Sequence, residues 1–447
     1  MHALTDGSPP LPIFVMLPAM MVYFALILLV IARASWSTRF LVITYATRLT
    51  MSAMPKFSFS HSPAGLSWNA LSSVVLVGVG CLLLHRSKAV PLVFLPVVPL
   101  TLVVLASAAV NGDVPGSIES IVKYAYFATI ALTAYDAFRI DGPGRVLTRL
   151  LFTFLLPFML QGASMALGIA KATESDGSAS YIGGYNHEAS FSIILLTGLL
   201  TAVLHPAMKS RYKLAIAFVC LGGIVAANYR TAMVAAGPLL VGLFMAAVTS
   251  AFAPRQRMIA AILAVLAVLA VVPVIPKLAG DRFDQLGELV ANPDILTKAP
   301  GEFRRSDVEI MSGRLFLWAE YIDDWRHGSD IQHVVGYGAN AWEGKYRYYA
   351  HNTLVSTLYE LGLLGVAAML TLWIGMFAQA FMAAPSDRLT LVMAHLGFFL
   401  LNMATMPIWM IEGLLFYGLL CGFTVYSRLQ RNMPVRPAAN SLRLHPV

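Results

Sequence analysis

Residues 348–374 read YYAHNTLVSTLYELGLLGVAAMLTLWI. After its polar start the stretch is almost wholly apolar, over roughly the 20 residues that a helix needs to cross a membrane. Similar apolar runs recur along the chain. They lie at about 11–32, 65–84, 89–110, 115–137, 146–169, 190–205, 214–229, 231–252, 259–276, 350–374, 389–406 and 407–426. The sequence therefore predicts an all-α polytopic membrane protein.

A weaker apolar run covers about 37–54, where Arg48 interrupts the pattern, so the predicted spans number about 12 or 13. The composition agrees: 58% of residues are hydrophobic and 12% are charged, against about 25% charged residues in soluble proteins. The net charge of +8 comes from basic residues at the ends of spans, which indicates a membrane protein and not one that binds nucleic acid. The first run lacks a basic region before it and a cleavage site of small residues, so we interpret it as a span.

One segment, 277–349, departs from the rest because it is rich in charged residues. A structureless loop of this length would be unusual, so we expect a small, partly helical cap. Apolar residues recur at helical spacing over 315–325, and Ser306 with Glu309 has the pattern of a capping box. The predicted organisation is a membrane bundle over 1–276 with ten spans, the cap over 277–349, three further spans over 350–426 and a basic tail over 427–447.

The positions of Lys and Arg predict the orientation. Basic clusters lie at 85–88, 139–149, 209–213, 255–257 and 388 and in the tail, each separated from the next by an even number of spans. They therefore fall on one face, which the positive-inside rule makes cytoplasmic. The C-terminus is then cytoplasmic, and 170–189 and 277–349 lie outside, in the periplasm of a bacterium. The N-terminus is periplasmic if the weak span is real and cytoplasmic if it is not.

Polar residues at the outer ends of spans are the candidates for chemistry. His351 and Asn352 stand where the cap rejoins the membrane, and a His there could act as a general base on a hydroxyl. Arg230, in a turn between two spans, and Arg314, in the cap, could hold an anion, since the guanidinium donates two parallel hydrogen bonds to a phosphate. The alternatives are an interfacial His without a role and an Arg whose side chain reaches the interface.

Secondary candidates are His187 and Glu188, which open another span from the outer face, and Lys123 within a span. Charged groups in spans usually face the bundle interior or a water-filled cavity. The alternative for Lys123 is a simple pair with Glu119 four residues earlier. The three cysteines lie in different apolar runs, and neither they nor the carboxylates have metal-ligand spacing. We therefore expect no metal, no cofactor and no structural disulfide.

The pattern resembles the O-antigen ligase/polymerase family of bacterial inner-membrane proteins, the WaaL-like and Wzy-like enzymes. The family signature is His, then Asn, Ser or Gln, nine residues, and Gly-x-x-Gly, which matches His351-Asn352 and Gly362-Leu-Leu-Gly365. Further elements resemble those of the family in the same order, over roughly 180–370. They are Asn228-Tyr-Arg230-Thr-Ala, Ser312-Gly-Arg314-Leu-Phe-Leu-Trp318, Val335-Gly-Tyr-Gly338 and, more loosely, Tyr185-Asn186-His187-Glu188. Tyr229 departs from the usual Ser.

The resemblance implies metal-independent, inverting glycosyl transfer at the periplasmic face from a saccharide linked to undecaprenyl diphosphate. In this glycosyl transfer, Arg230 and Arg314 would bind the diphosphate. His351 would activate the acceptor hydroxyl, and Asn352 would position His351. A polymerase, which extends the next lipid-linked repeat unit of an exopolysaccharide or O-antigen, is favoured over a ligase that transfers the glycan to lipid A-core. Flippase and chain-length regulator proteins would be its partners. A polysaccharide transporter or flippase is the second alternative; it is disfavoured because polar residues gather on the outer face and not at midplane.

Overall fold

The computed structural model describes residues 9–83, 89–172, 178–251 and 293–431, with a few positions between 253 and 262. It is 78% helical, and its two short strands form one hairpin. The bundle elements before the cap are α1 (Ile13–Ile31), α2 (Trp36–Ser52), α3 (Pro55–Ser58), α4 (Trp68–Leu83), α5 (Ala89–Asn111), α6 (Val114–Asp141), α7 (Pro143–Thr153), α8 (Leu155–Ala166), β1 (Lys171–Ala172), β2 (Ala179–Ser180), α9 (Glu188–Val203), α10 (Ser210–Ala226) and α11 (Arg230–Ala251). After the cap come α18 (Thr353–Phe381), α19 (Pro385–Asn402), η5 (Pro407–Trp409) and α20 (Ile411–Arg431).

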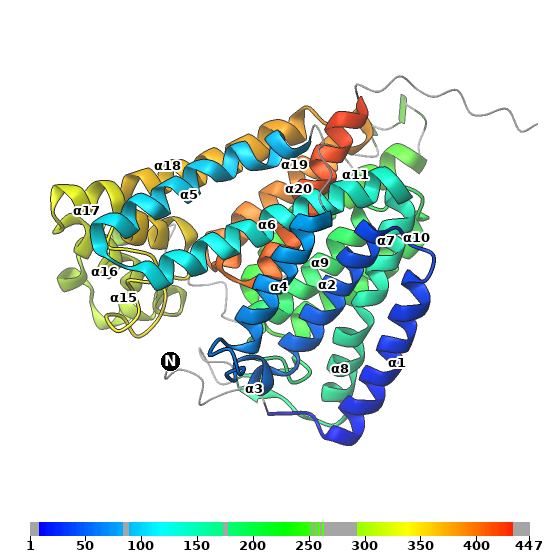
Figure 1. The fold of residues 1–447 in the computed structure, drawn as a ribbon, viewed down its shortest axis with the longest axis horizontal. Helices are drawn as coiled ribbons and strands as arrows, with labels where there is room; N and C mark the ends of the chain where they lie inside the picture. The colour runs from blue at the N-terminus through cyan, green and yellow to red at the C-terminus, as the bar shows by residue number, and fades with distance from the viewer. Residues whose placement is uncertain are drawn as a thin grey trace, which may run out of the picture.

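The helices form one bundle (Figure 1) whose interior is a single large apolar core. Around it, apolar side chains such as Leu29, Leu82 and Phe218 face outward, as expected where lipid replaces water. By length and composition, five described helices could cross a membrane: Ile13–Ile31, Ala89–Asn111, Pro143–Ala166, Arg230–Val248 and Thr353–Phe381. The prediction of an all-α polytopic membrane protein is confirmed. The total of 12 or 13 spans stays a prediction.

The structure adds detail to two of the predicted spans. The weak run at 37–54 is a complete helix, α2, because Arg48 is buried and donates to Asn69 and Ser73 of α4 instead of breaking the pattern. The run at 146–169 corresponds to the candidate span Pro143–Ala166, in which a turn at Phe154 separates α7 from α8. The predicted span 259–276 falls almost entirely outside the described residues.

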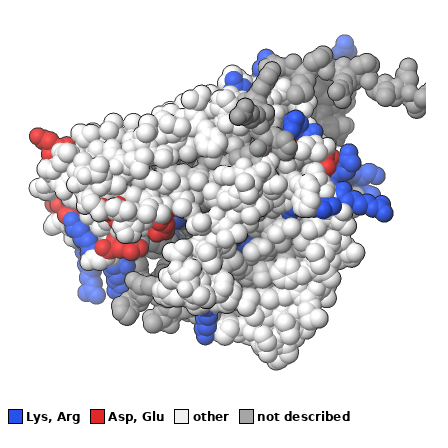
Figure 2. All heavy atoms as spheres, viewed as in Figure 1, with Lys and Arg blue, Asp and Glu red and all other residues white. Residues whose placement is uncertain are grey.

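Lys and Arg side chains gather at one end of the bundle, opposite the cap (Figure 2). Contacts join the helix ends there: Arg149 donates to the carbonyl of Val30 at the end of α1 and pairs with Asp141 at the end of α6. Lys213 donates to the carbonyl of Val203 at the end of α9. These basic residues therefore share one face, as their spacing predicts. The clusters at 85–88 and 432–447 lie outside the described residues.

The described part of the cap, 293–349, is compact and partly helical. Its elements are η2 (Pro293–Thr297), η3 (Pro300–Glu302), α15 (Arg305–Glu309), η4 (Ile310–Gly313), α16 (Arg314–Arg326) and α17 (Asp330–Val335). The helix expected over 315–325 is confirmed as α16. The capping box expected at Ser306 is wrong by two residues, because Asp307 accepts from the backbone N–H of Arg304. Residues 277–292 of the predicted cap lie outside the described part of the chain.

The cap joins the bundle at a break in α18. Gly362 interrupts this helix with φ 65° and ψ −163°, so the carbonyls of Tyr359 and Glu360 accept hydrogen bonds from elsewhere. The donors are the backbone N–H groups of Tyr337 and Gly338, at 3.0 and 2.9 Å. The two signature motifs, Gly-x-Gly and Gly-x-x-Gly, are therefore two halves of one contact.

This contact leaves no room for side chains. A Cβ atom on Gly362 would lie 2.4 Å from the carbonyl oxygen of Val334, and one on Gly336 would lie 2.3 Å from that of Glu360. Positive φ is also unfavourable for any residue with a Cβ atom. The glycines are required by close approach of two backbones.

We expect Gly362→Ala to lower the free energy of unfolding by at least about 2 kcal/mol, because it adds overpacking to an unfavourable φ. Gly222→Ala is the matched control: a Cβ atom on this helical glycine of α10 would have no other atom within 4 Å, and Ala favours the helix. Thermal unfolding in detergent measures both variants. Equal midpoints for the two would contradict the assigned role of Gly362.

Candidate active site

Four helices begin around one place on the cap side of the bundle, and each predicted site residue there lies at a helix start. His187 and Asn352 are the N-caps of α9 and α18, while Arg230 and Arg314 are the first residues of α11 and α16. The helices are in contact in pairs, α9 with α11 and α16 with α18. Helix N-termini present free backbone N–H groups and a partial positive charge. Their convergence favours an anion.

Arg314 links the cap to the bundle. Its Nη1 atom lies 3.5 Å from the Thr231 hydroxyl, a weak contact that positions the guanidinium against the first turn of α11. Arg230 is the residue before Thr231, so the two predicted phosphate-binding arginines come from distant parts of the chain to neighbouring positions. Thr231 was not predicted as a site residue, because a Thr beside an Arg carries no signal in sequence.

His351 is held between the cap and α18. Its backbone is left-handed, with φ 52°, and the preceding carbonyl, of Ala350, accepts a 2.6 Å hydrogen bond from the indole N–H of Trp318. The imidazole ring lies 4.0 Å, centroid to centroid, from the ring of Tyr349. Its Nδ1 atom is buried and has no hydrogen-bond partner among the described residues. This nitrogen can accept a proton or a hydrogen bond from a substrate.

The pKa of His351 is lowered to about 3. Burial is the largest cause, since it disfavours the charged imidazolium, and the positive charges of Arg314 and His187 act in the same direction. His351, Arg314 and His187 are thus close enough to interact electrostatically. At neutral pH the imidazole is uncharged.

Asn352 has a structural place beside His351. Its Oδ1 atom caps α18 by accepting from the backbone N–H groups of Leu354 and Val355, and its Nδ2 atom donates to the carbonyl of Met403 at the end of α19. Both ends of the buried amide are therefore engaged. Asn352 is suited to positioning His351 and not to contacting substrate.

His187 and Glu188 stand at the start of α9. The Nδ1 atom of His187 accepts from the backbone N–H of Ala189. Glu188 is buried, and its Oε2 atom lies 3.4 Å from the ammonium of Lys171 in β1. Lys171 was not predicted from sequence; the signal was a basic residue at the outer end of a span, where the positive-inside trend disfavours one.

Lys123 lies away from this group. Its ammonium pairs with Glu119 at 2.7 Å and lies 5.3 Å from the centre of the Trp409 ring. Glu119 also accepts from the side chain of Asn340. The alternative interpretation of Lys123, a pair with Glu119, is confirmed, and the pair belongs to the junction between cap and α6.

Unfavourable backbone conformations gather at the site. Five non-glycine residues in the described part of the chain have positive φ: Asn228, Met311, Ser312, Asn340 and His351. Asn228 lies two residues before Arg230, and Met311 and Ser312 lie within three residues of Arg314. His351 is itself a site residue, so only Asn340 is remote from the site. Each costs about 1 kcal/mol or more and persists only where surrounding contacts impose it. Such residues tend to cluster at active sites.

Residues 215–370 match the family model described as O-antigen ligase. This match supports assignment of the chain to the O-antigen ligase/polymerase family. The matched third of the chain runs from α10 into α18 and contains Arg230, Arg314 and His351 with both glycine motifs, whereas His187 lies before it. Members of this family are glycosyltransferase-like enzymes. The matched domain supports a function of the O-antigen ligase/polymerase type. A comparison with curated proteins found no match.

The lowered pKa of His351 makes the stability of the protein depend on pH. An unfolded His has a pKa near 6.5, so acid favours the unfolded chain, and stability is lost as the pH falls from 6.5 towards 3. We expect the wild type to lose about 1–2 kcal/mol more than His351→Asn between pH 8 and pH 5. Unfolding of both proteins in the same detergent at the two pH values checks this. Parallel losses would contradict burial of a neutral His351.

Proposed function

We propose that this protein is a polymerase of a bacterial surface polysaccharide, an exopolysaccharide or O-antigen. It transfers a glycan from undecaprenyl diphosphate onto the next lipid-linked repeat unit. The observation that supports this is the convergence of His351, Arg314 and the start of α11 at one place where helix N-termini meet. The donor carries a diphosphate, and the site offers two arginines and backbone N–H groups to it.

In the proposed reaction, an acceptor sugar hydroxyl attacks the anomeric carbon of the donor glycan. The bond between that carbon and the diphosphate oxygen breaks, and its electron pair leaves with the diphosphate. Arg230 and Arg314 stabilise the negative charge that grows on the leaving group. Displacement from the opposite side inverts the anomeric centre, and a diphosphate leaves without a metal ion or an acid.

The acceptor proton passes to His351, whose Nδ1 atom is buried and has no partner among the described residues. The pKa of this imidazole, lowered to about 3 by burial and by the nearby positive charges, is too low for an effective base. A bound diphosphate opposes the positive charge of Arg314, so the pKa of His351 rises when the donor binds. Asn352 fixes the start of α18 and thereby the position of His351.

We propose that the protein lies in the bacterial inner membrane, with the site facing the periplasm and the C-terminus in the cytoplasm. The support is the collection of basic residues at the end of the bundle opposite the cap. At the periplasmic face a lipid-linked donor reaches the site from the membrane. A flippase that delivers the donor and a regulator of chain length are the partners that this reaction needs.

Ligation of the finished glycan to lipid A-core is the second candidate; the matching family model is described as O-antigen ligase, but the match does not distinguish ligase from polymerase. Both reactions use the same donor and differ in the acceptor. A transporter would carry its polar groups near midplane, whereas those of this chain gather at the cap side.

Reconstitution tests the reaction. We expect purified protein, given lipid-linked repeat units in liposomes, to build a ladder of longer glycans on the lipid carrier, and we expect the ladder to persist with a metal chelator. Gel electrophoresis of the labelled glycan measures it. Label that moves only to added lipid A-core would identify a ligase, and His351→Ala with full activity would refute the assigned site.

Substitution of either arginine tests the diphosphate site. We expect Arg230→Ala and Arg314→Ala each to lower kcat/KM for the donor about 10²–10³-fold, because each removes a group that stabilises the leaving diphosphate. Lys at either position should recover only part of this, since it lacks the paired donors. Arg305→Ala, an exposed arginine at the start of α15, is the control and should keep wild-type activity. Site variants that are as active as this control would contradict the assignment.

A further inference from the structure

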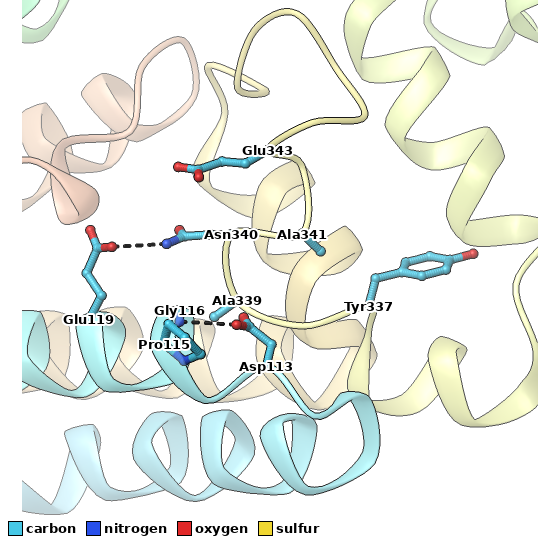
Figure 3. A pocket seen from close by; sticks show the side chains of 9 residues that line it. All are labelled: Asp113, Pro115, Gly116, Glu119, Tyr337, Ala339, Asn340, Ala341 and Glu343. Carbon is cyan, nitrogen blue, oxygen red and sulfur yellow. Dashed lines mark hydrogen bonds between the residues drawn. The ribbon is translucent and has the colours of Figure 1, made fainter. Parts of the chain in front are cut away.

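A second site lies between the start of α6 and the cap, where the residues drawn in Figure 3 line an open pocket of about 430 Å³. One wall carries Asp113 and Glu119 of the α6 start, and the other carries Asn340 and Glu343 of the cap. The volume lies in the range of small-ligand pockets. None of these residues belongs to the diphosphate site described above.

The walls are held in place by hydrogen bonds on both sides. The backbone N–H of Asn340 donates to Oε2 of the buried Glu360 at 3.0 Å, and its side chain donates to Glu119 at 3.1 Å. Glu119 is also paired with Lys123, and Asp113 accepts from the backbone N–H of Gly116. The carboxylates are thus oriented before any ligand enters, which reduces the ordering that binding requires.

The polar groups of the pocket are mainly hydrogen-bond acceptors. In Figure 3 the carboxylates of Glu119 and Glu343 lie near the Asn340 amide, and Glu343 is exposed. Ionised carboxylates accept hydrogen bonds from hydroxyl groups, which sugars supply in number. The same carboxylates repel a diphosphate. The pocket therefore suits an uncharged part of a glycan.

The distance from His351 fits a neighbouring sugar. Glu360, which holds Asn340, follows Asn352 by eight residues on the unbroken first part of α18, a rise of about 12 Å. A group in the pocket is therefore too far away to react at His351. It is near enough to be joined to the reacting sugar through a short glycan.

We propose that this pocket is a subsite for the acceptor glycan, which holds a sugar next to the one whose hydroxyl attacks. The inference rests on the proposed function. The acceptor is its occupant because the donor enters with its diphosphate at Arg230 and Arg314, whereas the acceptor presents only sugars to this side of the site.

The test measures the acceptor KM at saturating donor with two octyl glycosides, one carrying the terminal attacking sugar alone and one carrying the full repeat unit. In the wild type we expect the full repeat unit to have a KM about five- to twentyfold lower, as one or two hydrogen bonds provide. This advantage should disappear in Glu343→Ala and in Glu119→Gln/Glu343→Gln. Donor KM should not change.

Asp330→Asn is the matched control, because this exposed carboxylate of the cap does not line the pocket. It should keep the advantage of the longer acceptor. An advantage that persists in both pocket variants, while the wild type transfers, overturns the subsite and leaves the proposed function intact. A rise in donor KM in these variants would assign the pocket to the donor glycan and overturn the proposal. Absence of transfer by the wild type to either glycoside would refute the proposed function and the subsite with it.

Discussion

The contact between two stretches of backbone, at Gly336 and Gly362, determines how the rest of the site is arranged. A break in a buried helix leaves carbonyl groups without partners, and leaving such groups unsatisfied is costly. Here the N–H groups of Tyr337 and Gly338 are those partners. The cap is therefore part of the hydrogen bonding of α18 and not a loop laid over it.

The position of Arg314 follows from this contact. Its helix, α16, packs on α18, and aromatic side chains of the cap, including Tyr321 and Tyr337, pack against Tyr359 of α18. Once the cap is seated, the Arg314 guanidinium meets Thr231 at the start of α11. The Arg314 guanidinium then lies close to the start of α11 and to His351. Burial, together with the charge of Arg314, keeps the His351 imidazole neutral.

Charge is divided between the two sides of the cap. Arginines lie on the side of α11 and His351, and the carboxylates of Asp113, Glu119 and Glu343 lie on the side of α6. Glu360 stands at the boundary, where it is buried and accepts from Ser356 and from the backbone of Asn340. In the proposed reaction, this division favours the donor diphosphate on the arginine side and the sugar hydroxyls of the acceptor on the carboxylate side.

The sequence alone determined the fold class and most helix positions, because apolar runs of membrane length leave a helix as the only stable choice. It also contained the order of the motifs and hence the resemblance to the family. It could not show that Asn352 caps α18, since capping depends on the direction of one side chain, nor that Lys171 pairs with Glu188. Arg48 weakened the prediction of α2, because its hydrogen-bond partner Asn69 on α4 cannot be recognised from the sequence. Only the tertiary structure brought Arg230, Arg314 and His351 together, since more than a hundred residues separate the first from the last and their proximity depends on one backbone contact between two glycines.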